Sequence, residues 1–121
     1  MTWVLWLNTV AETLIAVGMF AVPDQFFPGA AGLSSSIARA FAFAILAVAF
    51  ISYRATWAGT SRETVTAIVL ILLVYHALQL LAQFVWAGLS PPMLIPPVII
   101  HTVACALLGL YFARLRSPAA A

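Results

Sequence analysis

One long apolar stretch, Val65–Ala87, constrains this chain more than any other feature of its sequence. It is long enough to cross a lipid bilayer as an α-helix, which takes about 20 residues. His76, Gln79 and Gln83 interrupt it at spacings of three and four residues, so they share one face of that helix. A polar face in hydrocarbon is costly unless it meets protein, water or a ligand. The stretch therefore predicts a membrane helix with one polar face.

The composition of the whole chain agrees with a membrane location. Of its 121 residues, 65% are hydrophobic and 7% are charged, whereas a soluble domain carries about a quarter charged residues. Too few polar side chains remain to cover a surface that faces water. We therefore expect an all-α integral membrane protein, a single transmembrane domain over residues 1–121. The expected location is a cell membrane crossed several times, namely the bacterial inner membrane.

Four segments have the length and composition of membrane spans: residues 3–22, 37–57, 64–87 and 93–113. Thr60 and Glu63 form a capping-box pattern ahead of the third. The second is rich in alanine, and small residues let membrane helices pack closely. The pattern predicts a polytopic four-helix bundle, with a homodimer or a larger membrane complex as possible assemblies.

The arginines predict the orientation of these spans. Arg54 and Arg62 flank the connection between the second and third spans, and Arg114 and Arg116 follow the fourth. With four crossings these regions share one side, and the excess of positive charge makes that side cytoplasmic. Both termini are then expected in the cytoplasm. The arginines are dispersed, so no basic patch for nucleic acid forms.

Three ionisable side chains fall near the middle of the bilayer. At about 1.5 Å per residue, Glu12 lies roughly 14 Å and His76 roughly 17 Å from the inner ends of their spans. His101 lies roughly 12 Å from the outer end of the fourth span. One carboxylate and two imidazoles at one depth are the candidates for catalysis here.

Polar residues near this depth extend the candidate site. Asn8 lies one turn before Glu12, while Gln79 and Gln83 continue outward from His76. With Arg39, at the outer end of the second span, they are the candidate ligand-binding residues. For Glu12 the open interpretations are a proton relay, a general acid or base, a counter-charge to a cationic ligand, and a protonated group bonded to Asn8.

Arg39 has two interpretations. It could contact a ligand, with Asp24 or Gln83 as its polar neighbour, or extend to the interface as many membrane arginines do.

The two histidines admit several interpretations. They could be axial ligands of a b-type haem, or join Glu12 in a metal site of two histidines and one carboxylate. They could also be hydrogen-bonding groups in a pocket, or ordinary core residues. Neither belongs to an HxxxH or HExxH pattern, so we assign no metal site and favour the pocket.

The functional hypothesis is a polar-lined pocket at the midplane that binds an apolar or lipid-like small molecule, with proton transfer by glutamate and histidine. A haem-bearing membrane protein, a proton-coupled small exporter and a structural subunit of a membrane complex are the alternatives. Whether the protein is an enzyme stays open.

The chain resembles the small bacterial DoxX-like four-helix membrane proteins in four stretches: GMFAVPDQFFP, ARAFAFAILA, VYHALQ and PPVIIH. That resemblance implies a four-helix bundle and, for most members, no settled activity. More distantly, the layout looks like the sterol-isomerase and sigma-2-receptor group, which implies an apolar amine or sterol ligand and a role for Glu12. Ala11-Glu12 in the first span also resembles the small multidrug resistance transporters, where the matching glutamate binds protons and cationic drugs.

Overall fold

In a computed structural model of the chain, residues 1–26, 33–85 and 91–117 are described. They form the five helices α1 (Trp3–Ala21), α2 (Pro23–Phe26), α3 (Leu33–Arg54), α4 (Arg62–Val85) and α5 (Pro91–Arg116). Four of these, α1, α3, α4 and α5, are long and apolar enough to cross a membrane. The described residues thus confirm an all-α fold with four helices of membrane length. Two units are distinct, one from Thr2 to Ala58 and one from Gly59 onward.

The ends of the helices differ from the expected spans because capping and backbone turns set them. Helix α3 begins four residues earlier than expected and includes the serines that were N-cap candidates. It ends at Arg54, after which Thr56 and Trp57 bond to carbonyls three residues back, and Gly59 takes a positive φ of 82°. The third span was expected to end at residue 87, which lies outside the described residues.

The start of α4 corrects the predicted cap. The N-cap is Ser61 rather than Thr60, because the helix begins at Arg62. The Ser61 hydroxyl accepts a hydrogen bond of 3.1 Å from the Thr64 backbone N–H and lies 2.9 Å from the Thr64 hydroxyl. A side-chain oxygen of the residue before a helix commonly satisfies an unpaired N–H of the first turn in this way.

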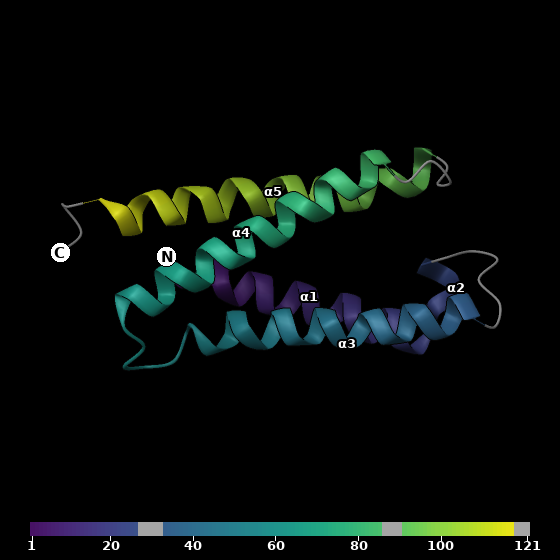
Figure 1. Ribbon diagram of the computed structural model, residues 1–121, viewed down its shortest axis with the longest axis horizontal. Coiled ribbons are helices and arrows are strands. Elements are labelled where there is room, and N and C mark those ends of the chain that lie inside the picture. Colours follow the sequence, from purple (N-terminus) through teal and green to yellow (C-terminus); the bar gives the residue numbers. More distant parts are fainter. Residues whose placement is uncertain (27–32, 86–90, 118–121) are drawn as a thin grey trace. The chain divides into compact units, whose positions relative to one another are not determined.

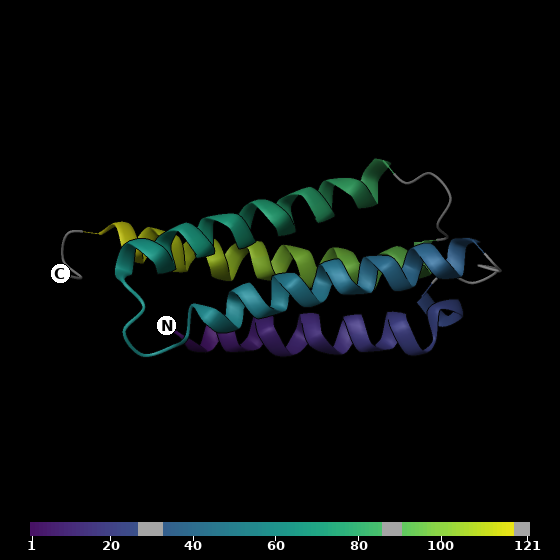
Figure 2. The ribbon, with the colours of Figure 1, turned by 60° about the horizontal axis from the view of Figure 1, so that its bottom comes forward.

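In the first unit α1 and α3 pack antiparallel, as Figures 1 and 2 show. Small side chains on the buried face of α3 allow the close approach. The Ser52 hydroxyl donates to the Leu5 carbonyl at 2.9 Å, which joins the start of α1 to the end of α3. Aromatic pairs at both ends, Trp6 with Tyr53 and Phe20 with Phe43, confirm this antiparallel register. The buried residues of α3 are Ala38, Ala42, Ile45, Ala49 and Ser52.

The short helix α2 folds back on the end of α1. Val22 leaves the helical region, with φ −135° and ψ 61°, directly before Pro23. The Phe26 ring then lies against Gly18, where a Cβ atom would come within 2.7 Å of the ring. Gly18 is therefore the position that permits this contact.

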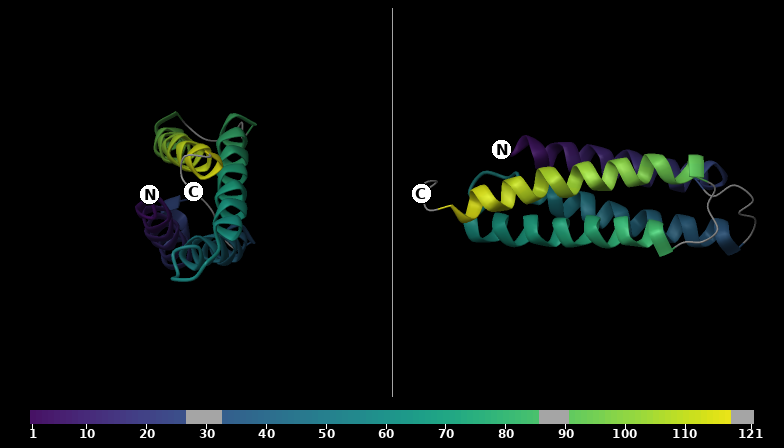
Figure 3. Two further views of the ribbon diagram at one scale, coloured as in Figure 1. Left: turned by 90° about the vertical axis from the view of Figure 1, so that its left-hand side faces the viewer. Right: turned by 90° about the horizontal axis from the view of Figure 1, so that it is seen from above.

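In the second unit α4 and α5 pack antiparallel (Figure 3). At one end the Arg62 guanidinium donates to the carbonyls of Leu115, at 2.6 and 3.1 Å, and of Ser117, at 3.0 Å. The carbonyls in the last turn of a helix have no partner within it, so a cation that binds them stabilises that end. This contact accompanies the extension of α5 to Arg116, three residues beyond the expected span.

Helix α5 contains Pro96 and Pro97 in its second turn. Proline has no N–H, so the hydrogen bonds that these two residues would donate to carbonyls one turn earlier cannot form. The part of α5 before His101 is therefore held by fewer backbone hydrogen bonds than the part after it.

Candidate functional site

A hydrogen bond between two buried histidines is the central feature of the α4–α5 unit. Nδ1 of His76 on α4 lies 2.9 Å from Nδ1 of His101 on α5. The side chains are 1% and 9% exposed, respectively. Their ring centroids are 5.2 Å apart and the ring planes are inclined by 46°. The structure thus brings together two of the three residues predicted for catalysis.

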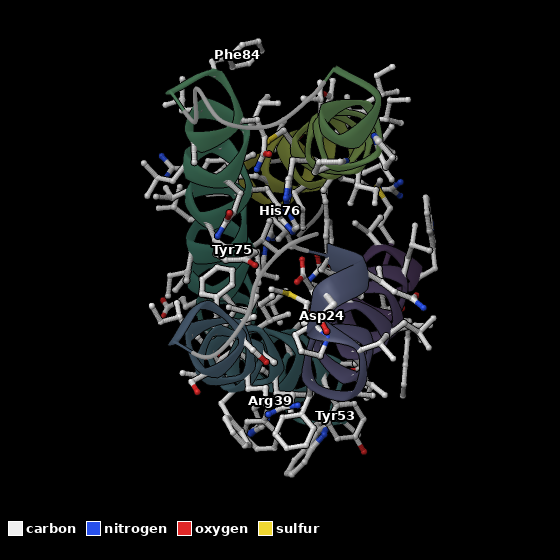
Figure 4. The ribbon with its side chains drawn as sticks, turned by 90° about the vertical axis from the view of Figure 1, so that its right-hand side faces the viewer. Asp24, Arg39, Tyr53, Tyr75, His76 and Phe84 are labelled. Carbon is white, nitrogen blue, oxygen red and sulfur yellow. The ribbon has the colours of Figure 1, made fainter. Side chains whose placement is uncertain are left out.

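The helical periodicity of α4 places His76 at this contact. It follows Val69 and Leu72 at spacings of seven and four residues, and all three side chains are buried. Figure 4 shows His76 on the side of α4 that faces α5, whereas Phe84, 74% exposed, points away. On α5, His101 and Leu108 are seven residues apart and both buried. Each histidine is therefore one polar position in an otherwise apolar packing stripe.

The contact between two Nδ1 atoms dictates how protons are arranged. A neutral imidazole carries one N–H and one bare nitrogen. A hydrogen bond between two like atoms therefore needs one ring protonated at Nδ1 and the other bare at Nδ1. The pair satisfies both buried nitrogens without any third group, which matters in an apolar interior where an unpaired polar atom is costly.

Tyr75 adds an aromatic wall to the pair. Its ring meets His76 edge-on with centroids 5.0 Å apart, and meets His101 edge-on at 6.5 Å. Contacts of this geometry favour one orientation of each ring. The sequence analysis did not single out Tyr75, although its place next to His76 in the chain was the available signal.

The geometry of the pair does not fit the haem interpretation. Two nitrogens on opposite sides of one ion lie about 4 Å apart, with each bond about 2 Å long. Here the Nδ1 atoms lie 2.9 Å apart and bond to each other, so the Nε2 atoms point in diverging directions. A single iron between these rings has no pair of facing nitrogens.

The metal interpretation also finds no group of ligands. Residues 1–26, 33–85 and 91–117 contain no cluster of three or more His, Cys, Asp or Glu side chains placed to hold an ion.

The glutamines continue the polar stripe of α4 in different ways. Both are partly buried. The Gln83 amide donates to the Gln79 carbonyl at 3.1 Å, which is a contact within its own helix. Gln83 is thus partly satisfied locally, and the Gln79 side chain is the nearer continuation of the stripe from His76.

Glu12 and Asn8 lie in the α1–α3 unit. They are 2% and 8% exposed and follow Leu5 along one buried face of α1. A carboxyl and an amide one turn apart on such a face confirm the predicted polar stripe of the first span. The expected proximity of Glu12 to the histidines stays a prediction.

Arg39 has a different partner from those expected. It is exposed, lies at the edge of the α1–α3 pair (Figure 4), and donates through Nε to the Phe20 carbonyl at 3.3 Å. The predicted bond to Asp24 is therefore replaced by one to the last turn of α1. An arginine that satisfies a helix-terminal carbonyl has a structural role at that position.

Comparison with known proteins adds no relative. No protein-family model matches the chain, and no curated protein or solved structure matches it significantly. What the fold and the site define is an all-helical chain with four helices of membrane length and a buried, hydrogen-bonded histidine pair.

Proposed function

We propose that this is a multi-pass membrane protein that binds an apolar or lipid-like small molecule and exchanges a proton with it at the histidine pair. In this proposal both termini are cytoplasmic, following the distribution of the arginines. The observation that carries it is the 2.9 Å contact between the buried Nδ1 atoms of His76 and His101.

The chemistry of the pair supports a ligand with both apolar and polar parts. Small-molecule sites are mostly apolar, with a few polar groups that fix orientation. Leu72, Tyr75 and Leu108 supply apolar surface on the same two helices. The imidazoles supply a proton donor and a proton acceptor, and histidine is the side chain most often used for general acid–base catalysis. Gln79 would add a second orienting group.

The test is thermal stability of the purified protein across a panel of fatty acids, phenols, sterols and apolar amines. A ligand of the folded state raises the unfolding temperature as its concentration rises. We expect a stabilising compound whose effect falls at least tenfold in apparent affinity in the His76→Asn, His101→Asn double variant. Leu78→Ala, at a position 60% exposed on the same helix, is the matched control and should keep the effect. A stabilising compound that acts equally on the double variant would refute the site.

Asparagine is the informative replacement at both positions. Its amide group lies about where Nδ1 of histidine lies, so an Asn–Asn pair can keep a hydrogen bond between α4 and α5. It cannot be protonated near neutral pH and has no equivalent of Nε2. Loss of the ligand effect with retained folding then reports on the imidazoles themselves.

A proton-coupled exporter is the second candidate, and the burial of Glu12 favours it. A carboxyl 2% exposed within a membrane-length helix is a functional candidate by default, since its charged form is costly there. Cells carrying Glu12→Gln should lose resistance to cationic compounds. Glu63→Gln, at an exposed carboxyl in the first turn of α4, should leave resistance unchanged. Equal resistance in both variants argues against export.

A further inference from the structure

The hydrogen bond between two Nδ1 atoms makes the histidine pair a chain with two ends. In imidazole the two nitrogens lie on either side of one carbon and point in diverging directions. When both Nδ1 atoms turn inward to each other, the two Nε2 atoms become the outer ends of the pair. The neutral pair then has one bare Nε2, on the ring that donates, and one Nε2–H, on the ring that accepts.

We propose that His76 and His101 form a two-ended proton relay that reverses its direction after every transfer. This deepens the proposed function and rests on it for the identity of the proton donor, an apolar weak acid such as a phenol or a fatty acid. The relay itself follows from the paired atoms and from the burial that holds them together.

One transfer balances as follows. The bare Nε2 of the donating ring takes a proton from the weak acid, whose O–H bond breaks and leaves its electron pair on oxygen. That ring passes its Nδ1 proton across the 2.9 Å contact to the bare Nδ1 of the other ring. The second ring releases its Nε2 proton to an acceptor beyond. One proton leaves the acid, one reaches the acceptor, and no electron is transferred between molecules.

The transfer exchanges the tautomers of the two rings. The ring that donated across the contact now has a bare Nδ1, and the ring that accepted now carries Nδ1–H. The next proton can enter only at the end from which the last one left, unless both rings reset. Resetting requires ring rotation, which breaks the buried hydrogen bond and the edge-on contacts with Tyr75. The pair is therefore suited to giving a proton and taking it back rather than to steady conduction.

The first test measures the tautomers directly. The chain has only two histidines, so ¹⁵N-labelled histidine gives a nuclear magnetic resonance spectrum of this pair alone. The expected result for the protein in lipid nanodiscs is a scalar coupling between the two Nδ1 nuclei through the shared proton. His76→Asn should abolish it while His101 remains visible. Two uncoupled rings, both protonated at Nε2, would overturn the relay.

The second test measures proton flux in liposomes that enclose a pH-sensitive dye. With a pH gradient imposed, the wild-type protein should show no steady flux above that of the His76→Asn, His101→Asn double variant. A steady flux that the double variant lacks would overturn the reversal of direction. A failed ligand panel combined with an intact Nδ1–Nδ1 coupling and no steady flux would refute the proposed ligand binding and support the relay.

Discussion

Buried polar side chains are the residues whose identity matters most in this protein. Among the described residues they are Asn8, Glu12, Ser52, His76 and His101. Removing such a group from water without a hydrogen bond is costly. Ser52 and the two histidines meet this requirement through contacts between different helices, so each of these contacts also fixes how two helices pack.

Ser52 allows a direct measurement of one such contact. Its hydroxyl is fully buried and donates to the Leu5 carbonyl at 2.9 Å. Hydrogen bonds between membrane helices contribute about 0.6 kcal/mol on average, and Ser52→Ala should lower the free energy of unfolding by about that amount. Ser36→Ala, at an exposed serine of the same helix, is the comparison. Equal unfolding curves in detergent for the wild type and Ser52→Ala would show that the bond contributes nothing.

The sequence located the polar residues but not their partners. Glu12, His76 and His101 were predictable because a polar side chain in a membrane helix is a costly exception. The bond between His76 and His101 was not predictable, because depth along a helix does not say which helix lies opposite. Arg39 shows the same limit: its carbonyl partner, Phe20, belongs to the backbone and has no signal in the sequence.

At the scale of the elements, alanines on one face of α3 decide how closely α1 packs. Ala49 is 3% exposed, while Ala47 on the same helix is exposed. Ala49→Leu should cost roughly 1–3 kcal/mol of stability because it overpacks the contact. Ala47→Leu should change stability by less than about 0.5 kcal/mol. Chemical unfolding in detergent measures both, and equal effects would contradict the assigned faces of α3.

Helix ends were the least predictable feature of the elements, because contacts distant in sequence set some of them. The contact of Arg62 with the end of α5 joins residues more than 50 positions apart. Four membrane-length helices, in contrast, follow from local composition and length, which is why their existence was predictable and their last residues were not.

The Arg62 contact predicts local rather than global loosening. Without the guanidinium, the Leu115 and Ser117 carbonyls lose three hydrogen bonds. Amide hydrogen exchange over the last turn of α5 should become roughly threefold to tenfold faster in Arg62→Ala, as expected for about one net hydrogen bond. Arg116→Ala, whose guanidinium lies over the Phe112 ring, should have a smaller effect. Unchanged exchange in Arg62→Ala would contradict the contact.

At the scale of the whole molecule, orientation in the membrane is the main prediction. Single cysteines at Ser61, Ser117 and Gln25, in a Cys105→Ala background, separate the two sides. The arginines predict that Ser61→Cys and Ser117→Cys react with a membrane-impermeant reagent only from the cytoplasmic side. Gln25→Cys should react only from the opposite side. Reaction of Ser61→Cys and Gln25→Cys from the same side would rule out this topology.

The central claim is that the histidine pair holds an apolar small molecule in the membrane. Mass spectrometry of what copurifies with the protein tests it most directly. The account predicts one apolar species with a dissociable proton, present in a fixed ratio to wild type and to Leu78→Ala, and lost from the His76→Asn, His101→Asn double variant. The same mixture of bulk membrane lipids in all three preparations would contradict it.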